Sequence, residues 1–463
     1  MHATLRAPRV PARLVAFARN DEGGLLIFSL FLLACMMLSV GLAIDVMRAE
    51  MARTRLQNTA DTAVLAAAAM EQTLDPRTVV EDYFAKAGLA SNLESVSITS
   101  TANSRTVTAN TNARLRTLLL GMVGIPVIEA RSTGTATAGF TDVEVSLVLD
   151  ISNSMSENGK MANLQSAARE FVDTVLDPDQ PGTMALSIVP YTAQVAAGPS
   201  ILNQLKVTST NSWASCVDFK TSDYTDTAIS PTTSLTQAQH FQHQPATSNP
   251  IDNPGCPQQT YEQIMAYSGS ATALKTRINQ LRPRHNTSIQ IGMKWGVALL
   301  DPAFQPVVAK LVSKGEASPQ FAERPFAYDR PGTMKVVVLM TDGENVDTWR
   351  IKSSYYDTTS ERSRWHSYAV YDYAASKKQN WTTYVQTDYT ASQADQMLSN
   401  ICSAAKARGI LIFSVGFEVT PYSASVMRNC ATSPSHYFSV EGTQISEAFA
   451  AIARQISMLR LLY

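Results

Sequence analysis

Residues 143–150 constrain the fold most, because this run is rich in Val and Leu and contains neither Gly nor Pro. Such a run predicts a strand that is buried on both faces of a sheet. The strand ends at Asp150, and Ser152 and Ser154 follow in a D-x-S-x-S pattern. Ligands of open α/β sheets bind beyond the carboxyl ends of the strands. A carboxylate and two hydroxyls at that place are hard oxygen ligands, which suit Mg²⁺, Mn²⁺ or Ca²⁺ better than zinc.

A second interpretation of this pattern is purely structural, since Asp and Ser residues also form turns and cap helices. Two later stretches bear on the choice. Residues 335–340 form another buried-strand run, and Thr341 and Asp342 follow it directly. Between the two strands, residues 286–292 contain Thr287 and open a predicted helix. Polar oxygen side chains therefore recur at the ends of elements that a parallel sheet would bring together.

These stretches together resemble the von Willebrand factor A domain and its metal-ion-dependent adhesion site. In that family a D-x-S-x-S motif follows the first strand, a threonine comes from a central loop, and an aspartate follows the fourth strand. The resemblance implies a bound Mg²⁺, or else Mn²⁺ or Ca²⁺, and a protein partner that offers an acidic ligand. The metal ligands that it implies in this sequence are Asp150, Ser152, Ser154, Thr287 and Asp342.

The pattern of elements after residue 142 alternates between strands and helices, which predicts an α/β domain with a mostly parallel sheet. The resemblance implies a Rossmann-like arrangement with helices on both faces over residues 142–463. Insertions at about 202–270 and 345–393 interrupt this domain, the first polar and the second rich in Tyr and Trp. The predicted strands are 143–150, 184–189, 335–340, 410–416 and 437–440, with an antiparallel edge at 194–197; the predicted helices are 158–176, 271–281, 289–300 and 445–459.

The amino-terminal part carries a charge-free run at residues 25–44, roughly twenty residues and long enough to span a bilayer as a helix. We therefore predict a tail at 1–22 and a transmembrane helix at 23–45. Four arginines precede the run and three follow it, so the charge rule favours an internal amino terminus only narrowly. A cleaved signal peptide is the alternative, although the run exceeds the usual apolar length of about 7–15 residues.

Residues 46–92 continue as a predicted helical stalk. The run L-Q-N-T-A-D-T-A-V-L-A-A-A at residues 56–68 resembles the amino-terminal signature of TadE/TadG-like proteins of the tight-adherence (Flp) pilus-assembly system. The resemblance implies a single-pass protein of the bacterial inner membrane, with most of the chain in the periplasm and pilus-assembly components as partners. Residues 93–141 alternate like short strands, with a possible helix at 115–123, and predict a small pilin-like α+β segment.

Four of the five cysteines fall into two pairs that are close in sequence. Cys216 and Cys256 lie in the first insertion, whereas Cys402 and Cys430 lie near the last strands. Even pairs outside a membrane predict disulfides in an oxidising compartment, and the alternative is four buried free thiols. The fifth, Cys35, is interpreted as a small apolar residue of the anchor.

Net charge and motifs exclude several function classes. The net charge of −1 gives no basic excess for nucleic acid, and the sequence has no nucleotide-binding or serine-hydrolase motif. His240 and His243 form an H-x-x-H pair near the insertion cysteines, but its spacing matches no usual zinc finger. A metal-dependent hydrolase needs a base near the metal, for which Glu344 is the nearest candidate. We predict that the protein is not an enzyme.

The second insertion leaves the sheet just after Asp342, on the same edge as the predicted metal. Aromatic side chains supply much of the binding energy at interfaces. We therefore predict a partner surface that includes Trp365 and Tyr368. The competing interpretation is that these aromatic residues pack a small core of the insertion itself.

The leading functional prediction is an assembly protein that binds a partner through its metal. One alternative is a minor pilin incorporated into the fibre, and another is an A-domain protein of a different envelope system. Processed pilin-like members of the family carry a glutamate five residues after a glycine cleavage site. After Gly24 that position is Ser29, which favours an unprocessed anchor.

Overall fold

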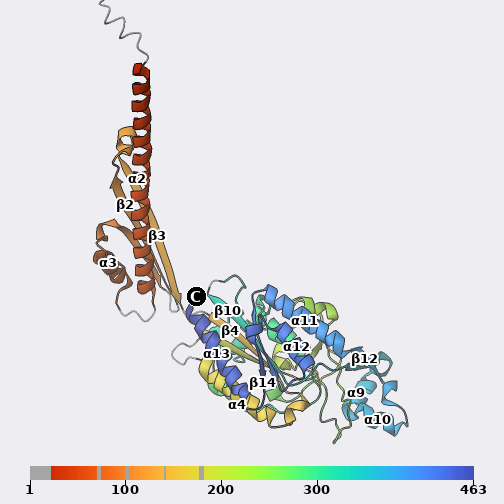
Figure 1. The fold of residues 1–463 in the computed structure, drawn as a ribbon. Coiled ribbons are helices and arrows are strands. Elements are labelled where there is room, and N and C mark those ends of the chain that lie inside the picture. The colour runs from red at the N-terminus through yellow and green to blue at the C-terminus, as the bar shows by residue number, and fades with distance from the viewer. Residues whose placement is uncertain are drawn as a thin grey trace, which may run out of the picture. The chain divides into compact units, whose positions relative to one another are not determined.

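The structure, a computed structural model, describes residues 22–69, 74–100, 104–139, 142–176, 182–330 and 332–462. The chain forms two compact units, Met1–Gly139 and Phe140–Tyr463. In Figure 1 the first unit runs from red to orange, and the second continues through yellow and green to blue.

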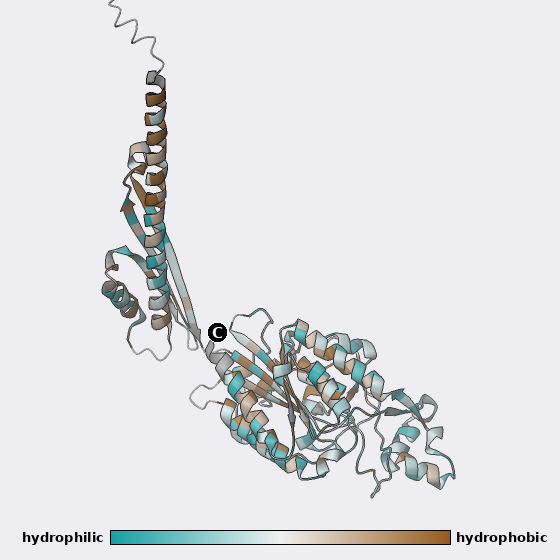
Figure 2. Cartoon of the chain, in the orientation of Figure 1, coloured by the Kyte–Doolittle hydropathy of each residue, from teal (hydrophilic) through white to brown (hydrophobic). Residues whose placement is uncertain are grey.

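The first unit is built on helix α2 (Glu22–Ala68). The amino-terminal half of α2 is apolar, as the brown segment in Figure 2 shows, and its large apolar side chains are exposed. By length and composition the helix is long and apolar enough to cross a membrane. Its other half packs against a three-stranded antiparallel sheet in the order β1-β2-β3. The remaining elements are α3 (Pro76–Lys86), β1 (Leu93–Ser100), β2 (Ser104–Arg116) and β3 (Val127–Gly139).

Small residues at helical spacing let α2 approach this sheet closely. Ala60 and Ala63 are fully buried, and a Cβ built on Gly134 of β3 would lie 3.0 Å from the Ala60 backbone. The predicted stalk and the predicted pilin-like segment consequently share one hydrophobic core.

The helix predicted at 115–123 is wrong for most of its length. Strand β2 continues to Arg116, which pairs with Val127 of β3, and only a 3-10 turn, η2 (Leu120–Val123), follows. Pairing with β3 satisfies the backbone groups of β2, so this short apolar run does not become helical.

The second unit contains a six-stranded sheet in the order β14-β13-β10-β4-β5-β9. All neighbouring strands are parallel except β9, which runs antiparallel to β5. The antiparallel edge predicted at 194–197 is wrong, because Ala196 makes only an isolated parallel bridge to Gln263 and a distant segment supplies the edge. The strands are β4 (Asp142–Asp150), β5 (Met184–Tyr191), β9 (Met265–Ser268), β10 (Thr333–Thr341), β13 (Leu411–Phe417) and β14 (Tyr437–Val440).

Helices cover both faces of this sheet, and alternate residues of β4 enter the two cores. Val145 and Leu147 face one helical layer, and Val148 faces the other. The buried Glu144 is compensated by the Lys335 ammonium at 2.5 Å. One layer contains α4 (Lys160–Val175), α6 (Ala271–Gln280) and α13 (Gln444–Leu462); the other contains α7 (Ile289–Ala298), α8 (Gln305–Ser313), α11 (Ala391–Ala407) and α12 (Pro421–Cys430).

The two insertions pack against each other, although residues 271–344 of the main fold separate them. His240 of the first insertion lies 3.1 Å from His366 of the second, measured between ring nitrogens, and Phe241 joins the hydrophobic cluster of the second. The first insertion follows α5 (Gly198–Leu202) and contains β6 (Val207–Thr208), β7 (Val217–Asp218) and β8 (Leu235–Gln237). The second contains β11 (Thr348–Ile351), α9 (Thr359–Ser367), α10 (Val370–Ser376) and β12 (Val385–Tyr389).

The structure separates the two aromatic residues that were predicted to face a partner. Trp365 is 0% exposed, and its indole N–H donates to the carbonyl of Tyr355 at 2.7 Å. It packs against the rings of Tyr373 and Tyr384, so the packing interpretation holds for this residue and its placement on a partner surface is wrong. Tyr368 is 48% exposed.

This difference predicts opposite mutational outcomes at the two positions. Trp365→Phe removes a buried hydrogen bond and leaves a void, and we expect it to lower the free energy of unfolding by about 2 kcal/mol. Tyr368→Ala removes a half-exposed ring and should cost less than about 0.5 kcal/mol. Urea unfolding of both variants measures this, and equal losses would contradict the packing seen here.

Both predicted disulfides are confirmed. Cys216 is bonded to Cys256 within the first insertion, and Cys402 of α11 is bonded to Cys430 of α12. The remaining Cys35 is free and exposed on α2. The second disulfide joins two helices on the same face of the six-stranded sheet.

Candidate metal centre

The candidate centre lies at the carboxyl ends of two neighbouring parallel strands, β4 and β10. Their register pairs Leu149 with Met340, so that the next residues, Asp150 and Thr341, end the strands side by side. The Thr341 hydroxyl donates to Asp150 Oδ2 at 2.7 Å. The sheet itself therefore fixes the position of the first predicted ligand.

The other predicted ligands gather around the same point. The hydroxyls of Ser152 and Ser154 lie 3.0 Å apart, and Ser154 Oγ donates to Asp342 Oδ1 at 2.7 Å. A methyl group built on Gly343 would lie 3.6 Å from Thr287 Oγ1 and 3.8 Å from Ser154 Oγ. Residues from three separate stretches of the sequence thus converge in one cluster of oxygen atoms.

Asp150 is fully buried within hydrogen bonds that favour its charged form. Oδ1 accepts the backbone N–H of Ser152 at 2.7 Å, and Oδ2 accepts the hydroxyl of Thr341. The Tyr191 oxygen lies 3.3 Å from Oδ2, but its hydroxyl donates to the carbonyl of Met340 at 2.9 Å. Burial, and next the neighbouring charge of Asp342, nevertheless raise the pKa of the Asp150 carboxyl to about 6. Two carboxylates this close disfavour each other's ionisation, and a cation between them would relieve that repulsion.

Lys160 is a member of the cluster that the sequence analysis missed. Its ammonium lies 3.0 Å from Asp342 Oδ2 and 3.8 Å from Glu418 Oε2, and its side chain is buried. A signal was present in the sequence, because Lys160 opens helix α4, where a positive charge opposes the helix dipole. A lysine in such a place points to a carboxylate partner outside the helix.

The donor set fits a hard divalent cation. Two carboxylates and three hydroxyls supply only oxygen, which suits Mg²⁺, Mn²⁺ or Ca²⁺. The H-x-x-H pair fits a metal less well, since His240 faces His366 whereas the ring of His243 packs on Trp349 and Trp381. Among the described residues, no group of three or more His, Cys, Asp or Glu side chains is placed to hold a metal.

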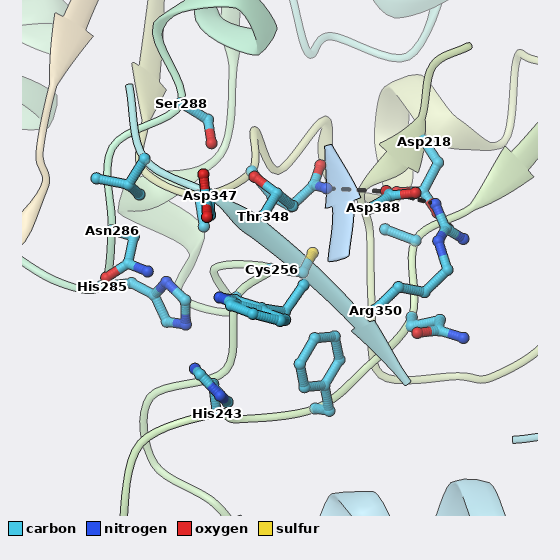
Figure 3. Close-up of a pocket in the computed structure, with 18 residues that line it drawn as sticks. Asp218, His243, Cys256, His285, Asn286, Ser288, Asp347, Thr348, Arg350 and Asp388 are labelled. Atoms are coloured by element: carbon cyan, nitrogen blue, oxygen red, sulfur yellow. Dashed lines mark hydrogen bonds and ion pairs between the residues drawn. The ribbon is translucent and has the colours of Figure 1, made fainter. Parts of the chain in front are cut away.

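Residues of both insertions and the two sequence neighbours of Thr287 line a pocket (Figure 3). Asn286 and Ser288, the neighbours of Thr287, form part of its wall, and Trp349 adds an aromatic face. On one side Arg350 bridges Asp218 and Asp388 at 2.9 Å each. The pocket therefore joins the loop that carries Thr287 to a wall with both apolar and charged groups.

Acid should destabilise the contact between the two insertions. Burial, and next the charge of His366, lower the pKa of His240 to about 4. Since the unfolded chain takes up this proton near pH 6.5, stability is present above that pH and is lost as pH falls toward 4, by ~2–3 kcal/mol.

Urea unfolding at pH 7 and pH 4.5 measures this loss. His240→Phe keeps a ring beside Trp213 and removes the titrating group, so the variant should lose less stability on acidification than the wild type. An identical pH dependence in both proteins would contradict the assignment.

The sequence was compared with protein-family models and with curated proteins. Residues 23–70 match the family model described as "Tad: Putative Flp pilus-assembly TadE/G-like". No curated protein matches the sequence.

The solved structures that match the chain have low sequence identity and low TM-scores. The von Willebrand factor domain of the type V pili tip protein Mfa5 from Porphyromonas gingivalis is 13% identical, with 69% of this chain and 97% of that chain covered and a TM-score of 0.37. The adhesive tip pilin GBS104 from Group B Streptococcus agalactiae is 11% identical, with 68% and 99% covered and a TM-score of 0.36. A mutant of the PilB minor pilin from Streptococcus sanguinis is 12% identical, with 79% and 78% covered and a TM-score of 0.34.

Proposed function

We propose, from the match of residues 23–70 to the TadE/G-like Flp pilus-assembly family, that the protein is a single-pass component of the bacterial inner membrane that captures an assembly partner outside the cytoplasm. In this proposal the partner binds through a divalent cation in a von Willebrand factor A domain formed by the second unit. The protein acts by binding and not as an enzyme.

The convergence of Asp150, Ser154 and Asp342 is the observation that carries the proposal, together with the nearby Ser152 and Thr287. The strand order supports the A-domain assignment, because the sheet reads 3-2-1-4-5-6 when its strands are numbered along the second unit. This is an order of doubly wound folds, whose ligands bind beyond the carboxyl ends of the strands.

When bound, the cation would supply a Lewis-acidic position that an acidic side chain of the partner can occupy. The chain's own residues position it, since the hydroxyls of Ser152, Ser154 and Thr287 are neutral and the charge comes from Asp150 and Asp342. Because these ligands leave room in the shell of a divalent ion, cation and partner should bind cooperatively. The adjoining pocket would then receive residues next to the acidic side chain.

The compartment is supported by two independent features. Two disulfides in the second unit are typical of an oxidising compartment such as the periplasm. The arginines before the apolar run favour a cytoplasmic amino terminus. Proteinase added to spheroplasts should therefore digest the second unit, and full protection there would refute this orientation.

The binding role is tested with the full-length protein in detergent. Solubilised membranes from cells that make Flp pili are passed over the immobilised protein in Mg²⁺ and, in parallel, in EDTA. We expect a captured pilus-assembly component that is lost in EDTA and is absent with Asp150→Asn. Capture that is equal in all three conditions would overturn the proposal.

A further inference from the structure

The connection between β2 and β3 is a second apolar feature of the first unit, apart from the anchor. It comprises residues 117–126, includes the turn η2, and carries no charged residue. Leu118 is 63% exposed and Met122 is 77% exposed, and Ile125 is exposed as well. Exposed apolar side chains gathered at one place mark a contact with another apolar phase.

This connection, called here the β2–β3 tip, is fixed to α2 at one level. The Asp45 carboxylate accepts the backbone N–H groups of residues 118, 119 and 120 at 2.9–3.1 Å. Leu119 lies against Gly41 so closely that a Cβ on this glycine would come within 2.0 Å of Leu119 Cδ1. The tip therefore lies beside residues 41–45 of the helix (Figure 1).

Residues 41–45, where the tip contacts α2, include the end of the apolar run. The charge-free residues 25–44 correspond to about 30 Å of helix, the thickness of the hydrocarbon core. Leu119 also lines a groove with Met36, Met37 and Val40, which lie further into the run. The tip thus overlaps the end of the span by at least one helical turn.

Charged side chains lie on the side of the tip that faces away from the charge-free residues 25–44. Arg48, three residues after Asp45, donates to the carbonyl of Arg116 at 3.5 Å, and Arg116 is the residue just before the tip. Further along the strands, Glu129 pairs with Arg114 at 3.1 Å and with Arg131 at 2.6 Å. Apolar side chains followed by arginines match the change from acyl chains to phosphate headgroups.

We propose that the β2–β3 tip is a second membrane-embedded element, which inserts into the boundary of the bilayer beside the anchor. It would brace the helix at the point where it leaves the lipid and hold the sheet of the first unit at the membrane surface. The inference rests on the proposed anchor, because the bilayer reaches the tip only if α2 spans it. Lipid is the occupant that follows from this continuity between the tip and the apolar run.

The test uses the full chain in nanodiscs of phosphatidylcholine and phosphatidylglycerol that contain a nitroxide-labelled lipid. Without reductant the disulfides stay closed, so a thiol-reactive fluorophore labels the free Cys35 in the anchor. In a Cys35→Ser background, Met122→Cys places the fluorophore at the tip. Thr137→Cys places it on an exposed residue near the opposite end of β3 and is the matched control.

We expect several-fold quenching at Cys35 and in Met122→Cys, and little in Thr137→Cys. Quenching at Cys35 but not in Met122→Cys would overturn the inference and leave the anchor intact. Absence of quenching at Cys35 would instead overturn the anchor, and the inference with it. Disulfide-linked dimers of Met122→Cys without lipid quenching would assign the tip to a second copy of the chain and likewise overturn the inference.

Discussion

Asp150→Asn is expected to lower the affinity for Mg²⁺ or Mn²⁺ by ~100-fold or more, since even residues that only orient metal ligands contribute 10–100-fold. The substitution removes one of the two charges in the cluster and keeps the shape of the side chain. An amide oxygen in the place of Oδ1 can still accept the N–H of Ser152 at 2.7 Å, and the amide NH₂ in the place of Oδ2 can donate to the Thr341 oxygen at 2.7 Å. The NH₂ group also faces the Tyr191 oxygen. The Tyr191 hydroxyl donates its proton to the Met340 carbonyl at 2.9 Å, so its oxygen can accept from the amide.

The same variant should be at least as stable as the wild type when no metal is present. Burial and Asp342 raise the pKa of the Asp150 carboxyl from 3.8 to about 6, so its ionisation opposes folding increasingly between these pH values and fully above the second. Urea unfolding in EDTA at pH 7.5 measures the difference, with Asp173→Asn at an exposed position of α4 as the control. Unchanged Mg²⁺ affinity in Asp150→Asn would remove this residue from the metal site.

The second large effect is expected from Lys160→Met, which removes the buried ammonium beside Asp342 and Glu418. Breaking a buried ion pair leaves an uncompensated charge and costs roughly 3–5 kcal/mol of unfolding free energy. Saturating Mg²⁺ should restore more stability to this variant than to the wild type, because a cation can replace the missing positive charge at Asp342.

Lys275→Met is the matched control, because Lys275 pairs with Asp173 at 2.6 Å but at a partly exposed place. Its removal should cost less than about 1 kcal/mol and should not respond to Mg²⁺. A Lys160→Met variant as stable as the wild type in EDTA would contradict the role assigned to this lysine. Equal Mg²⁺ stabilisation of both proteins would show that the ammonium and the cation do not share Asp342.

Local patterns in the sequence predicted the elements of the second unit well, because strands buried on both faces leave a clear apolar signal. The run at 143–150 became β4, and the run at 335–340 lies within β10. Pairing between distant segments was not predictable in the same way. Residues 194–197 have an edge-like pattern, but β9 occupies the edge because of contacts that no local pattern encodes.

In the second insertion, too, the sequence alone did not predict which aromatic side chains are buried. Its composition predicts a large apolar area but does not tell which side chains are buried by their own neighbours. Trp365 is enclosed by Tyr373 and Tyr384, while Tyr368 remains exposed three residues later. The packing of the two insertions on each other, through His240 and His366, also depends on the folded structure.

At the candidate centre, the resemblance predicted which oxygen side chains would gather, and the structure brings them together. It did not include Lys160, Tyr191 or Thr341, whose contacts with the two carboxylates appear only when the strands are aligned. Thr341 and Tyr191 lie against the Asp150 carboxylate, whereas Lys160 offsets the charge of Asp342, so Lys160 alone changes the charge that a cation would meet.

Titration calorimetry of the full-length protein in detergent with Mg²⁺, and separately with Mn²⁺, tests the central claim most directly. The account predicts one binding site in the wild type and none in Asp150→Asn at the same concentrations. Absence of binding by the wild type at millimolar cation, or equal binding by the variant, would show that these residues are only caps and turns and would contradict the proposed metal-dependent capture.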